Sequence, residues 1–244
     1  MRLPRVYTAL PLRVDSEVRV EGAPARHLLQ VLRLRPGAEV LLFNGDGRDY
    51  RGRLLTVERR AAEVAVLAAG EVEASPALAI RLGLGISRGE RMDFAIQKAV
   101  ELGVTEIIPL LTARCGVRLS PERLRKRQEH WQGVVVAACE QSGRRRLPSL
   151  HPATALAHSL EEPPAPGVGI LLDHRASASL ARLPPPPGRV WLLTGPEGGW
   201  TGAERAQLLS AGFRGAHLGP RVLRTETAPL AAIASIQALW GDFR

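Results

Sequence analysis

The pattern of apolar residues changes near residue 73, and this change limits the possible folds more than any other feature. Between residues 5 and 73 the apolar residues form short extended runs, such as EVRVE and AEVLLFN, which turn signals separate. After residue 77 runs typical of strands alternate with runs typical of helices. Because 244 residues suffice for two domains, we expect one domain over residues 1–73 and a second over 74–244.

The first part of the sequence is typical of a small β-barrel module. Asn44-Gly45-Asp46-Gly47 lies between two extended runs and predicts a hairpin, because Asn and Gly accept the positive φ of tight turns. One helix is expected at about residues 25–34. The short polar stretch over residues 70–77, which contains a proline, suits a joint between domains.

The second part predicts an α/β layer with a mostly parallel sheet. Thr201 and Glu204 form a capping box that fixes where one helix begins. The last helix, TAPLAAIASIQALW, is apolar on nearly all sides and must therefore be buried on nearly all sides. Either the middle of the core or a subunit interface would satisfy this requirement.

The net charge of +9 favours a polyanionic partner. The alternative is that GC-rich coding has raised the arginine content, since 31 of the 33 basic residues are Arg. However, residues 1–150 carry 25 basic and 17 acidic side chains, whereas residues 151–244 carry 8 and 7. This uneven distribution indicates that polyanion binding belongs to the first 150 residues.

The chain shows no sign of a metal site or of a secreted framework. Cys115 and Cys139 are too far apart for a CxxC motif, and the six histidines form no cluster with metal-ligand spacing. We see no apolar run of signal-peptide or membrane-spanning length. These features predict a cytoplasmic protein with no metal and no membrane partner.

Two segments are candidates for ligand binding because each follows a predicted strand. Thr194-Gly195-Pro196-Glu197-Gly198-Gly199 follows RVWLL, and the segment from Leu218 to Ala228 follows GAH. In open α/β sheets ligands bind at the carboxyl ends of strands, where helix N-termini also offer free N–H groups. The glycines would let the backbone approach a flat ligand such as adenine.

These segments also carry a family resemblance. LLTGPEGGW, LGPRVLRTETAPLAAIASIQAL and EQSGRRRLP resemble the RsmE family of ribosomal RNA uridine N3-methyltransferases, within the SPOUT superfamily. RLPRVY and HLLQVLRLRPG are similar to the N-terminal region of that family. The resemblance covers nearly the whole chain in the same order.

The resemblance implies a PUA-like β-barrel joined to an α/β domain with a deep trefoil knot, whereas the pattern alone would predict an unknotted sheet. It implies a homodimer that uses S-adenosylmethionine to methylate N3 of a uridine in 16S ribosomal RNA or the small ribosomal subunit. The cofactor would contact Leu172, Thr194, Gly195, Pro196, Glu197, Gly198, Gly199, His217, Leu218, Gly219, Leu223, Arg224, Thr225 and Thr227, with Asp173 as a further candidate.

Four residues are candidates for the methyl transfer itself. Arg224 would stabilise the anionic uracil ring, and either Glu226 or solvent would take its proton. Glu226 could also be simply a charge favoured at a helix N-terminus. Arg144 and Arg146 could reach the site from the dimer mate.

Arginines would bind the RNA through its phosphates and would recognise it by its shape. Base stacking would contribute little, since the chain has only ten aromatic residues. The candidates are Arg5, Arg33, Arg35, Arg48, Arg51, Arg53, Arg144, Arg145 and Arg146.

Two other functions remain open from the sequence. Gly83, Gly85 and Gly89 lie where a dinucleotide-binding loop would stand in an oxidoreductase, although their GxGxxxG spacing is one residue too long. A non-catalytic RNA-binding factor in ribosome assembly would share the basic surface without methyl transfer.

Overall fold

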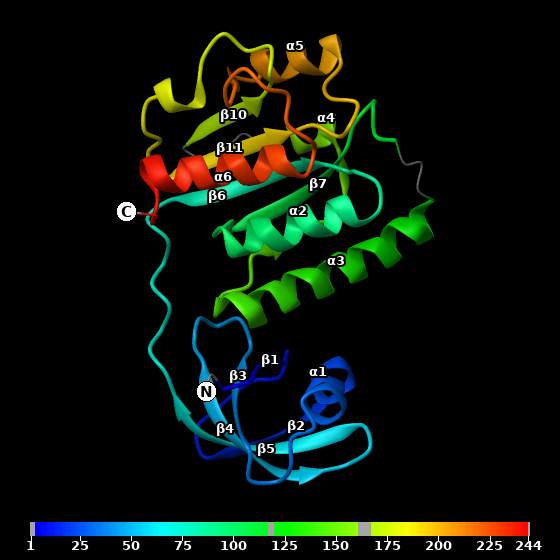
Figure 1. Ribbon diagram of the computed structural model, residues 1–244, viewed down its shortest axis with the longest axis vertical. Helices are drawn as coiled ribbons and strands as arrows, with labels where there is room; N and C mark the ends of the chain where they lie inside the picture. The colour runs from blue at the N-terminus through cyan, green and yellow to red at the C-terminus, as the bar shows by residue number, and fades with distance from the viewer. Residues whose placement is uncertain (1–2, 117–119, 161–166, 244) are drawn as a thin grey trace. The chain divides into compact units, whose positions relative to one another are not determined.

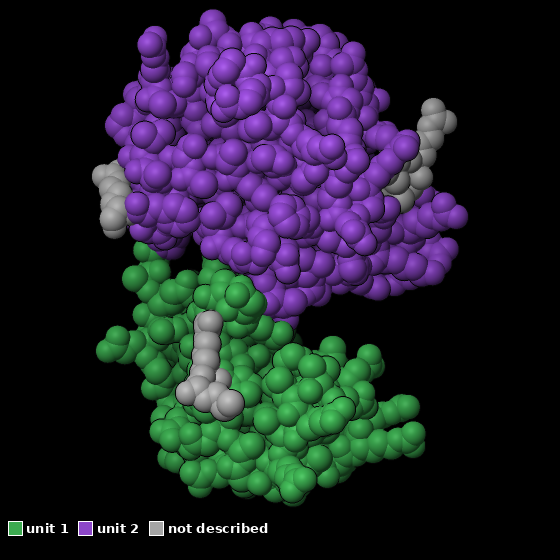
Figure 2. Space-filling view, in the orientation of Figure 1, with its two compact units in different colours: residues 1–75, 139–147 green, residues 76–138, 148–244 purple. Residues whose placement is uncertain are grey.

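The structure, a computed structural model, describes residues 3–116, 120–160 and 167–243. The chain divides into two compact units, the first made of residues 1–75 and 139–147, the second of residues 76–138 and 148–244 (Figure 2). The boundary near residue 75 lies close to the expected joint. The segment 139–147 was expected in the second domain and instead belongs to the first unit, although it is distant in sequence.

The first unit is built on a curled five-stranded sheet with the order β1-β3-β4-β5-β2. β1 pairs with β3 in parallel and the other pairs are antiparallel. The register shifts twice between β4 and β5, and such bulges bend a sheet. The strands are β1 (Arg5–Tyr7), β2 (Ser16–Glu21), β3 (Glu39–Phe43), β4 (Tyr50–Val57) and β5 (Ala61–Ala69).

The curled sheet encloses an apolar core that includes Val6, Val20, Leu28, Val40 and Val64. The predicted hairpin at residues 44–47 joins β3 to β4 and is confirmed. Because β1 and β2 are the two end strands of the sheet, the barrel expected from the sequence is open along one side.

The helix expected at residues 25–34 is shorter and less regular than predicted. It consists of α1 (Gly22–Arg26) followed by one wide π-helical segment, η1 (His27–Val31). Arg33 then has a φ of 53°, a left-handed conformation that ends helical propagation. In this wide turn the N–H of Leu34 donates to the carbonyl of Leu28 at 3.0 Å, and the Leu28 side chain is fully buried.

The second unit confirms the predicted parallel sheet. Its strand order is β12-β10-β11-β6-β7-β8, with β9 also paired to β7, and every pair is parallel. The strands are β6 (Ala79–Gly85), β7 (Glu106–Leu111), β8 (Ser149–Leu150), β9 (Thr154–Ala155), β10 (Val168–Leu172), β11 (Arg189–Thr194) and β12 (Arg214–Ala216).

Helices cover this sheet, and α2 lies beside α6 on one of its faces (Figure 1). The capping box of Thr201 and Glu204 begins α5, as the sequence predicts. The helices are α2 (Glu90–Glu101), α3 (Pro121–Ser142), α4 (Leu156–Ser159), α5 (Gly202–Ser210) and α6 (Thr227–Trp240), with a short 3-10 turn, η2 (Leu180–Arg182).

The apolar last helix, α6, belongs to the core of its own chain. Ile233 and Ile236 are fully buried, so their burial needs no second subunit. The polar Gln237 is also buried, and its amide nitrogen donates to the carbonyl of Leu102 at the end of α2, at 3.0 Å. The sequence left open whether this helix lies in the core or at a subunit interface. The structure places its central residues in the core of the chain.

Candidate functional site

A cavity of about 440 Å³ lies in the second unit, beyond the carboxyl ends of β10, β11 and β12. This is the edge of a parallel sheet where ligands are expected. It brings together most of the expected cofactor residues, while Thr227 begins α6 outside the lining. The lining consists of Arg91, Arg114, Leu172, Asp173, His174, Arg175, Thr194, Gly195, Pro196, Glu197, Gly198, Gly199, Trp200, His217, Leu218, Gly219, Arg221, Val222, Leu223, Arg224, Thr225, Glu226 and Ala228.

Thr194 ends β11 and opens the first loop of the cavity. Its side chain is almost entirely buried, and its hydroxyl has no hydrogen-bond partner among the described residues. A buried hydroxyl without a partner costs free energy, so this atom is positioned to bond a group that enters the cavity. The loop lies so close to β6 that a Cβ on Gly85 would stand 2.5 Å from the Pro196 nitrogen.

Close packing of this kind explains why glycine stands at positions 83 and 85, which resembled part of a dinucleotide-binding loop in the sequence. Gly83 and Gly85 lie inside β6 rather than in a loop between strand and helix. A Cβ on Gly83 would stand 2.2 Å from the Leu193 side chain of the neighbouring strand β11. These glycines therefore allow the backbone of the cavity loop and the strand beneath it to pack closely, and the oxidoreductase reading loses its main support.

Glu197 connects the first loop to the start of α2. Its carboxylate accepts a hydrogen bond from the backbone N–H of Arg88 at 2.9 Å and from the guanidinium of Arg91 at 3.3 Å. Partial burial alone would raise the pKa of Glu197, but these two donors lower it below its ordinary value. The side chain of Glu197, expected to contact a cofactor, therefore serves to fix the loop.

The second loop runs from His217 to Glu226, directly before α6, and is tied to the first. The Thr225 hydroxyl donates to the carbonyl of Gly195 at 3.0 Å. The Gly219 N–H donates to Nδ1 of His217 at 2.9 Å, and Gly219 has a φ of 111° that favours glycine. The side chains of His217 and Thr225 thus form hydrogen bonds that shape the loop.

Arg224 and Glu226 line the same cavity, two residues apart. Glu226 stands at the N-cap position of α6, but its side chain makes no capping hydrogen bond. Its Oε2 atom is buried and has no hydrogen-bond partner among the described residues. A carboxylate oxygen in this state can accept a proton or a hydrogen bond from a bound molecule.

Leu172 and Asp173, at the end of β10, hold the floor of the cavity. The Leu172 carbonyl accepts a hydrogen bond from the indole N–H of Trp200 at 3.3 Å. The buried Asp173 carboxylate binds the side chains of Arg175 and Arg205. Burial would raise the pKa of Asp173, but the backbone N–H of Arg175 and these guanidinium groups lower it.

Sequence reasoning missed five residues of the cavity wall, namely Arg91, Arg114, His174, Arg175 and Trp200. Trp200 directly follows the Gly-rich loop, and this position was a usable signal. Arg114 comes from the chain after β7, and its guanidinium donates to the carbonyl of Gly198 at 3.0 Å. Arg91 lies on α2. Nothing local marked Arg91 or Arg114, because only the fold brings them to this edge.

The other expected catalytic residues, Arg144 and Arg146, do not line the cavity of this chain. Both belong to the segment 139–147 of the first unit. Arg5, an expected RNA contact, has a side chain that is 4% exposed and forms an ion pair with Asp49 at 2.7 Å. This burial points to a role in the fold of the first unit.

From residue 13 onward, the arginines of the first unit that the structure describes are at least partly exposed. Arg51 and Arg53 share an ion pair with Glu39, at 2.7 Å and 3.7 Å. Exposed pairs of this kind contribute little and yield readily to a phosphate partner. Arg33 and Arg35 are exposed and follow η1 in the chain.

Across the part of the chain that the structure describes, no group of three His, Cys, Asp or Glu side chains is placed to hold a metal ion. Within the same residues, every helix is too short or too polar to cross a membrane.

Comparison with known proteins finds two family models along the chain. Residues 73–237 match the model of an RNA methyltransferase domain, and residues 20–67 match that of an RNA methyltransferase PUA domain. A relative from Buchnera aphidicola, named ribosomal RNA small subunit methyltransferase E, is 30% identical over 99% of this chain and 98% of its own. One with the same name from Synechocystis is 31% identical over 96% of this chain and 77% of its own.

Two solved structures are similar over the full length of both chains. The ribosomal RNA small subunit methyltransferase E of Neisseria gonorrhoeae, bound to S-adenosyl methionine, is 41% identical with a TM-score of 0.92. A methyltransferase of Legionella pneumophila in complex with the same cofactor is 34% identical with a TM-score of 0.95. With its cavity at the carboxyl edge of a parallel sheet and its similarity to these proteins, this chain belongs to the RNA methyltransferase family.

Proposed function

We propose that this protein transfers the methyl group of S-adenosylmethionine to N3 of a uridine in the 16S RNA of the small ribosomal subunit. The observation that carries this proposal is the meeting of Arg224 and an unpartnered Glu226 carboxylate oxygen in one cavity. The names of the full-length relatives support the RNA substrate, and the cofactor in two similar structures supports the methyl donor. The choice of N3 rests on the family resemblance of the Leu218–Ala228 loop.

The cavity fits the proposed methyl donor. The unpartnered Thr194 hydroxyl offers one polar contact. The loop beside it carries glycines where a side chain would crowd the wall, since a Cβ on Gly198 would stand 2.8 Å from the Arg114 Cβ. Thr194–Gly199 and the backbone of residues 217–225 would hold the donor, which supplies an activated methyl group when it is bound.

The protein has two tasks in this reaction, namely orientation and removal of one proton. N3 of uracil is weakly acidic and becomes a nucleophile once its proton leaves. Arg224 would stabilise the negative charge that develops on the ring, because a guanidinium is always charged and donates several hydrogen bonds. Glu226 would accept the N3 proton at its unpartnered oxygen.

The RNA substrate and the subunit arrangement are part of the same proposal. We place RNA on the arginines of the first unit, which matches a PUA domain. A homodimer and a deep trefoil knot follow from the family resemblance, as does action in the cytoplasm, where small subunits are assembled. In a dimer, the exposed Leu239 and Phe243 at the end of α6 are candidates for interface residues.

The decisive experiment is methyl transfer to small subunits that lack the modification, followed by digestion of the RNA and mass spectrometry of its nucleosides. We expect N3-methyluridine, and reverse transcription should stop beside the modified site, since N3 methylation blocks the pairing edge. A ribose 2′-O-methyl product would overturn the choice of atom. Absence of any methyl transfer, despite binding of the RNA, would favour a non-catalytic assembly factor.

A further inference from the structure

Three arginines of the first unit donate to consecutive parts of one extended segment, residues 70–73. The guanidinium of Arg48 donates to the carbonyl of Gly70 at 2.7 Å, and that of Arg145 donates to the carbonyl of Glu71, also at 2.7 Å. Nε of Arg146 makes a longer bond of 3.4 Å to the carbonyl of Glu73. We call Arg48, Arg145 and Arg146 the arginine row. Its members come from positions about 100 residues apart in the sequence.

The bonds to carbonyls orient these arginines without cancelling their charge. A carbonyl carries no net charge, and a guanidinium has five N–H donors, so each side chain keeps its charge and several free donors. Among the described residues neither Arg48 nor Arg146 forms an ion pair with a carboxylate. Asp49 lies between two guanidinium groups, that of Arg5 at 2.7 Å and that of Arg145 at 3.4 Å, so one positive charge remains in excess there.

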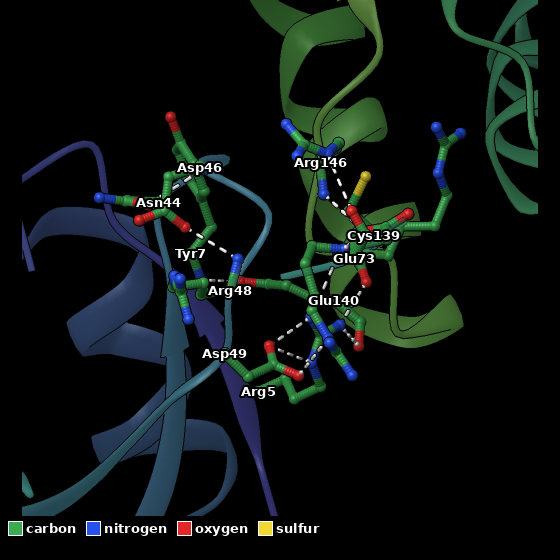
Figure 3. A network of polar contacts seen from close by, with 12 residues as sticks. Arg5, Tyr7, Asn44, Asp46, Arg48, Asp49, Glu73, Cys139, Glu140 and Arg146 are labelled. Carbon is green, nitrogen blue, oxygen red and sulfur yellow. Dashed lines mark hydrogen bonds and ion pairs between the residues drawn. The ribbon is translucent and has the colours of Figure 1, made fainter. Parts of the chain in front are cut away.

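Glu73 fixes the backbone from which two of the arginines project. One of its carboxylate oxygens accepts the backbone N–H of Arg145 at 2.6 Å and that of Arg146 at 2.9 Å (Figure 3). Charge-assisted bonds to backbone N–H groups are short and strong. The negative charge of Glu73 is therefore engaged with the backbone rather than with the guanidinium groups.

Arg5 fixes the same segment from inside the unit. Its guanidinium donates to the carbonyl of Cys139 at 2.6 Å and to that of Arg144 at 3.1 Å (Figure 3). The Cys139 carbonyl lies in the last turn of α3 and also accepts the backbone N–H of Gly143 at 3.1 Å, while Arg144 follows the helix. Gly47 completes the arrangement, because a Cβ there would stand 3.0 Å from the Arg146 guanidinium.

We propose that the arginine row binds the phosphate backbone of the RNA substrate, and that Glu73 and Arg5 are positioning residues for it. Guanidinium groups held in a fixed orientation are suited to phosphate oxygens, and among the described residues those of Arg48 and Arg146 pair with no carboxylate. Arg146, a candidate for the methyl transfer, would thus hold RNA rather than take part in the chemistry. This inference rests on the proposed RNA substrate, but not on the methyl donor or on the atom that is methylated.

The direct test measures how an unmodified transcript of small-subunit RNA binds the full-length protein without cofactor, at several salt concentrations. For Arg48→Ala and Arg146→Ala we expect affinity to fall about tenfold or more. Each change should also reduce the slope of log affinity against log salt by about 0.7–0.9, the value of one lost phosphate contact. Arg19→Ala is the matched control, since Arg19 is an exposed arginine of the same unit that pairs with Glu58 at 2.7 Å. Equal slopes for all three variants and the wild type would overturn the proposal.

Glu73→Ala separates positioning from simple electrostatics. Removal of a negative charge should strengthen RNA binding if only net charge matters. If Glu73 positions the arginine row, RNA affinity should instead fall about tenfold, since the backbone N–H groups of Arg145 and Arg146 lose their acceptor. Glu71→Ala is the control, because it also removes one exposed negative charge next to the arginine row. Glu71 contacts Arg145 through its backbone carbonyl, which the substitution keeps.

Folding is checked by thermal unfolding and by binding of S-adenosylhomocysteine, which the second unit should retain. If Glu73→Ala fails to fold, Glu73→Gln takes its place, since it keeps an acceptor oxygen but loses the charge. We still expect weaker RNA binding than in the wild type. RNA binding as tight as the wild type, or tighter, in the folded Glu73 variant would refute the positioning role. A failure of methyl transfer with normal RNA binding would affect only the proposed function.

Discussion

At the scale of single residues, the proposed roles of Arg224 and Glu226 depend on how their loop is held beside the cavity. Both stand on a loop that the Thr225 hydroxyl fastens to Gly195. The intervening threonine is thus used for structure, while its two neighbours line the cavity. Because Glu226 makes no capping bond to its helix, its placement at a helix N-terminus does not by itself account for its side chain.

Arg224→Ala should lower turnover roughly a hundredfold, on the scale of the loss of one donor to a developing oxyanion. Binding of S-adenosylmethionine should change little. A higher pH should restore part of the rate, since more of the uridine then ionises without help. The measurement is single-turnover methyl transfer as a function of pH.

Arg221→Ala is the matched control for Arg224, because Arg221 carries the same charge on the same loop and also lines the cavity. We expect only a small loss of turnover in that variant. Equal losses in the two variants would mean that the loop contributes general positive charge rather than a specific donor.

At the scale of elements, α6 and β10 show how the second unit supports the cavity. α6 begins directly after the cavity loop, and its central residues are buried against its own chain. Asp173, at the end of β10, binds Arg205 on α5. The cavity loop before α6 therefore ends in a buried helix, and the end of β10 is fixed to α5 by an ion pair.

Ile236→Glu should unfold or strongly destabilise the protein rather than yield a folded monomer. Ile236 is fully buried in one chain, and a carboxylate at such a site is left unpaired and loses the apolar contacts. We expect a loss of about 3 kcal/mol or more in the free energy of unfolding. Ala238→Glu is the control, since Ala238 is exposed on the same helix. Chemical denaturation measures both, and a well-folded Ile236→Glu monomer would contradict the core role of α6.

Asp173 should make stability depend on pH under acidic conditions. Its folded-state pKa lies below the ordinary value of 3.8, so the unfolded state binds the proton more readily. The stability that Asp173 contributes is therefore fully present above about pH 5 and is lost as the pH falls through and below 3.8. Asp173→Asn should lower the melting temperature at pH 7 and flatten its decrease in acid. Asp15→Asn, at an exposed position, should leave both unchanged, and an unaltered acid profile in Asp173→Asn would disprove the assignment.

At the scale of the whole molecule, the first unit is discontinuous in sequence. Residues 139–147 complete it, and Arg5 and Glu73 hold them there. The cavity, in contrast, is lined by residues of the second unit. Removal of the N-terminal domain thus affects the two units differently.

A protein that lacks residues 1–73 should still bind S-adenosylhomocysteine but lose most of its RNA affinity. It should also lose order at the end of α3, since the Cys139 and Arg144 carbonyls lose Arg5 as a donor. Calorimetry measures the two affinities, and hydrogen exchange should show faster exchange over residues 139–147. RNA binding equal to that of the whole chain would remove the first unit from substrate recognition.

The sequence by itself determined the features that depend on neighbours in the chain. The turn at Asn44–Gly47 and the capping box of Thr201 and Glu204 follow from residues a few positions apart, and both were predicted correctly. The alternation of strands and helices after residue 77 led to the parallel sheet. The loops at its carboxyl edge followed from strand order along the chain, and the family resemblance supplied the cofactor and the reaction.

Only the tertiary structure decided what depends on contacts between distant residues. Arg5 is buried because Asp49 and the end of α3 surround its guanidinium, although its charge alone suggested an RNA contact. The segment 139–147 joins the first unit through bonds to residues more than 70 positions away. Arg114 reaches the cavity because β7 lies near β11 in the sheet. The physical reason is the same in each case, since burial and hydrogen-bond partners are set by the packing of elements and not by the local order of residues.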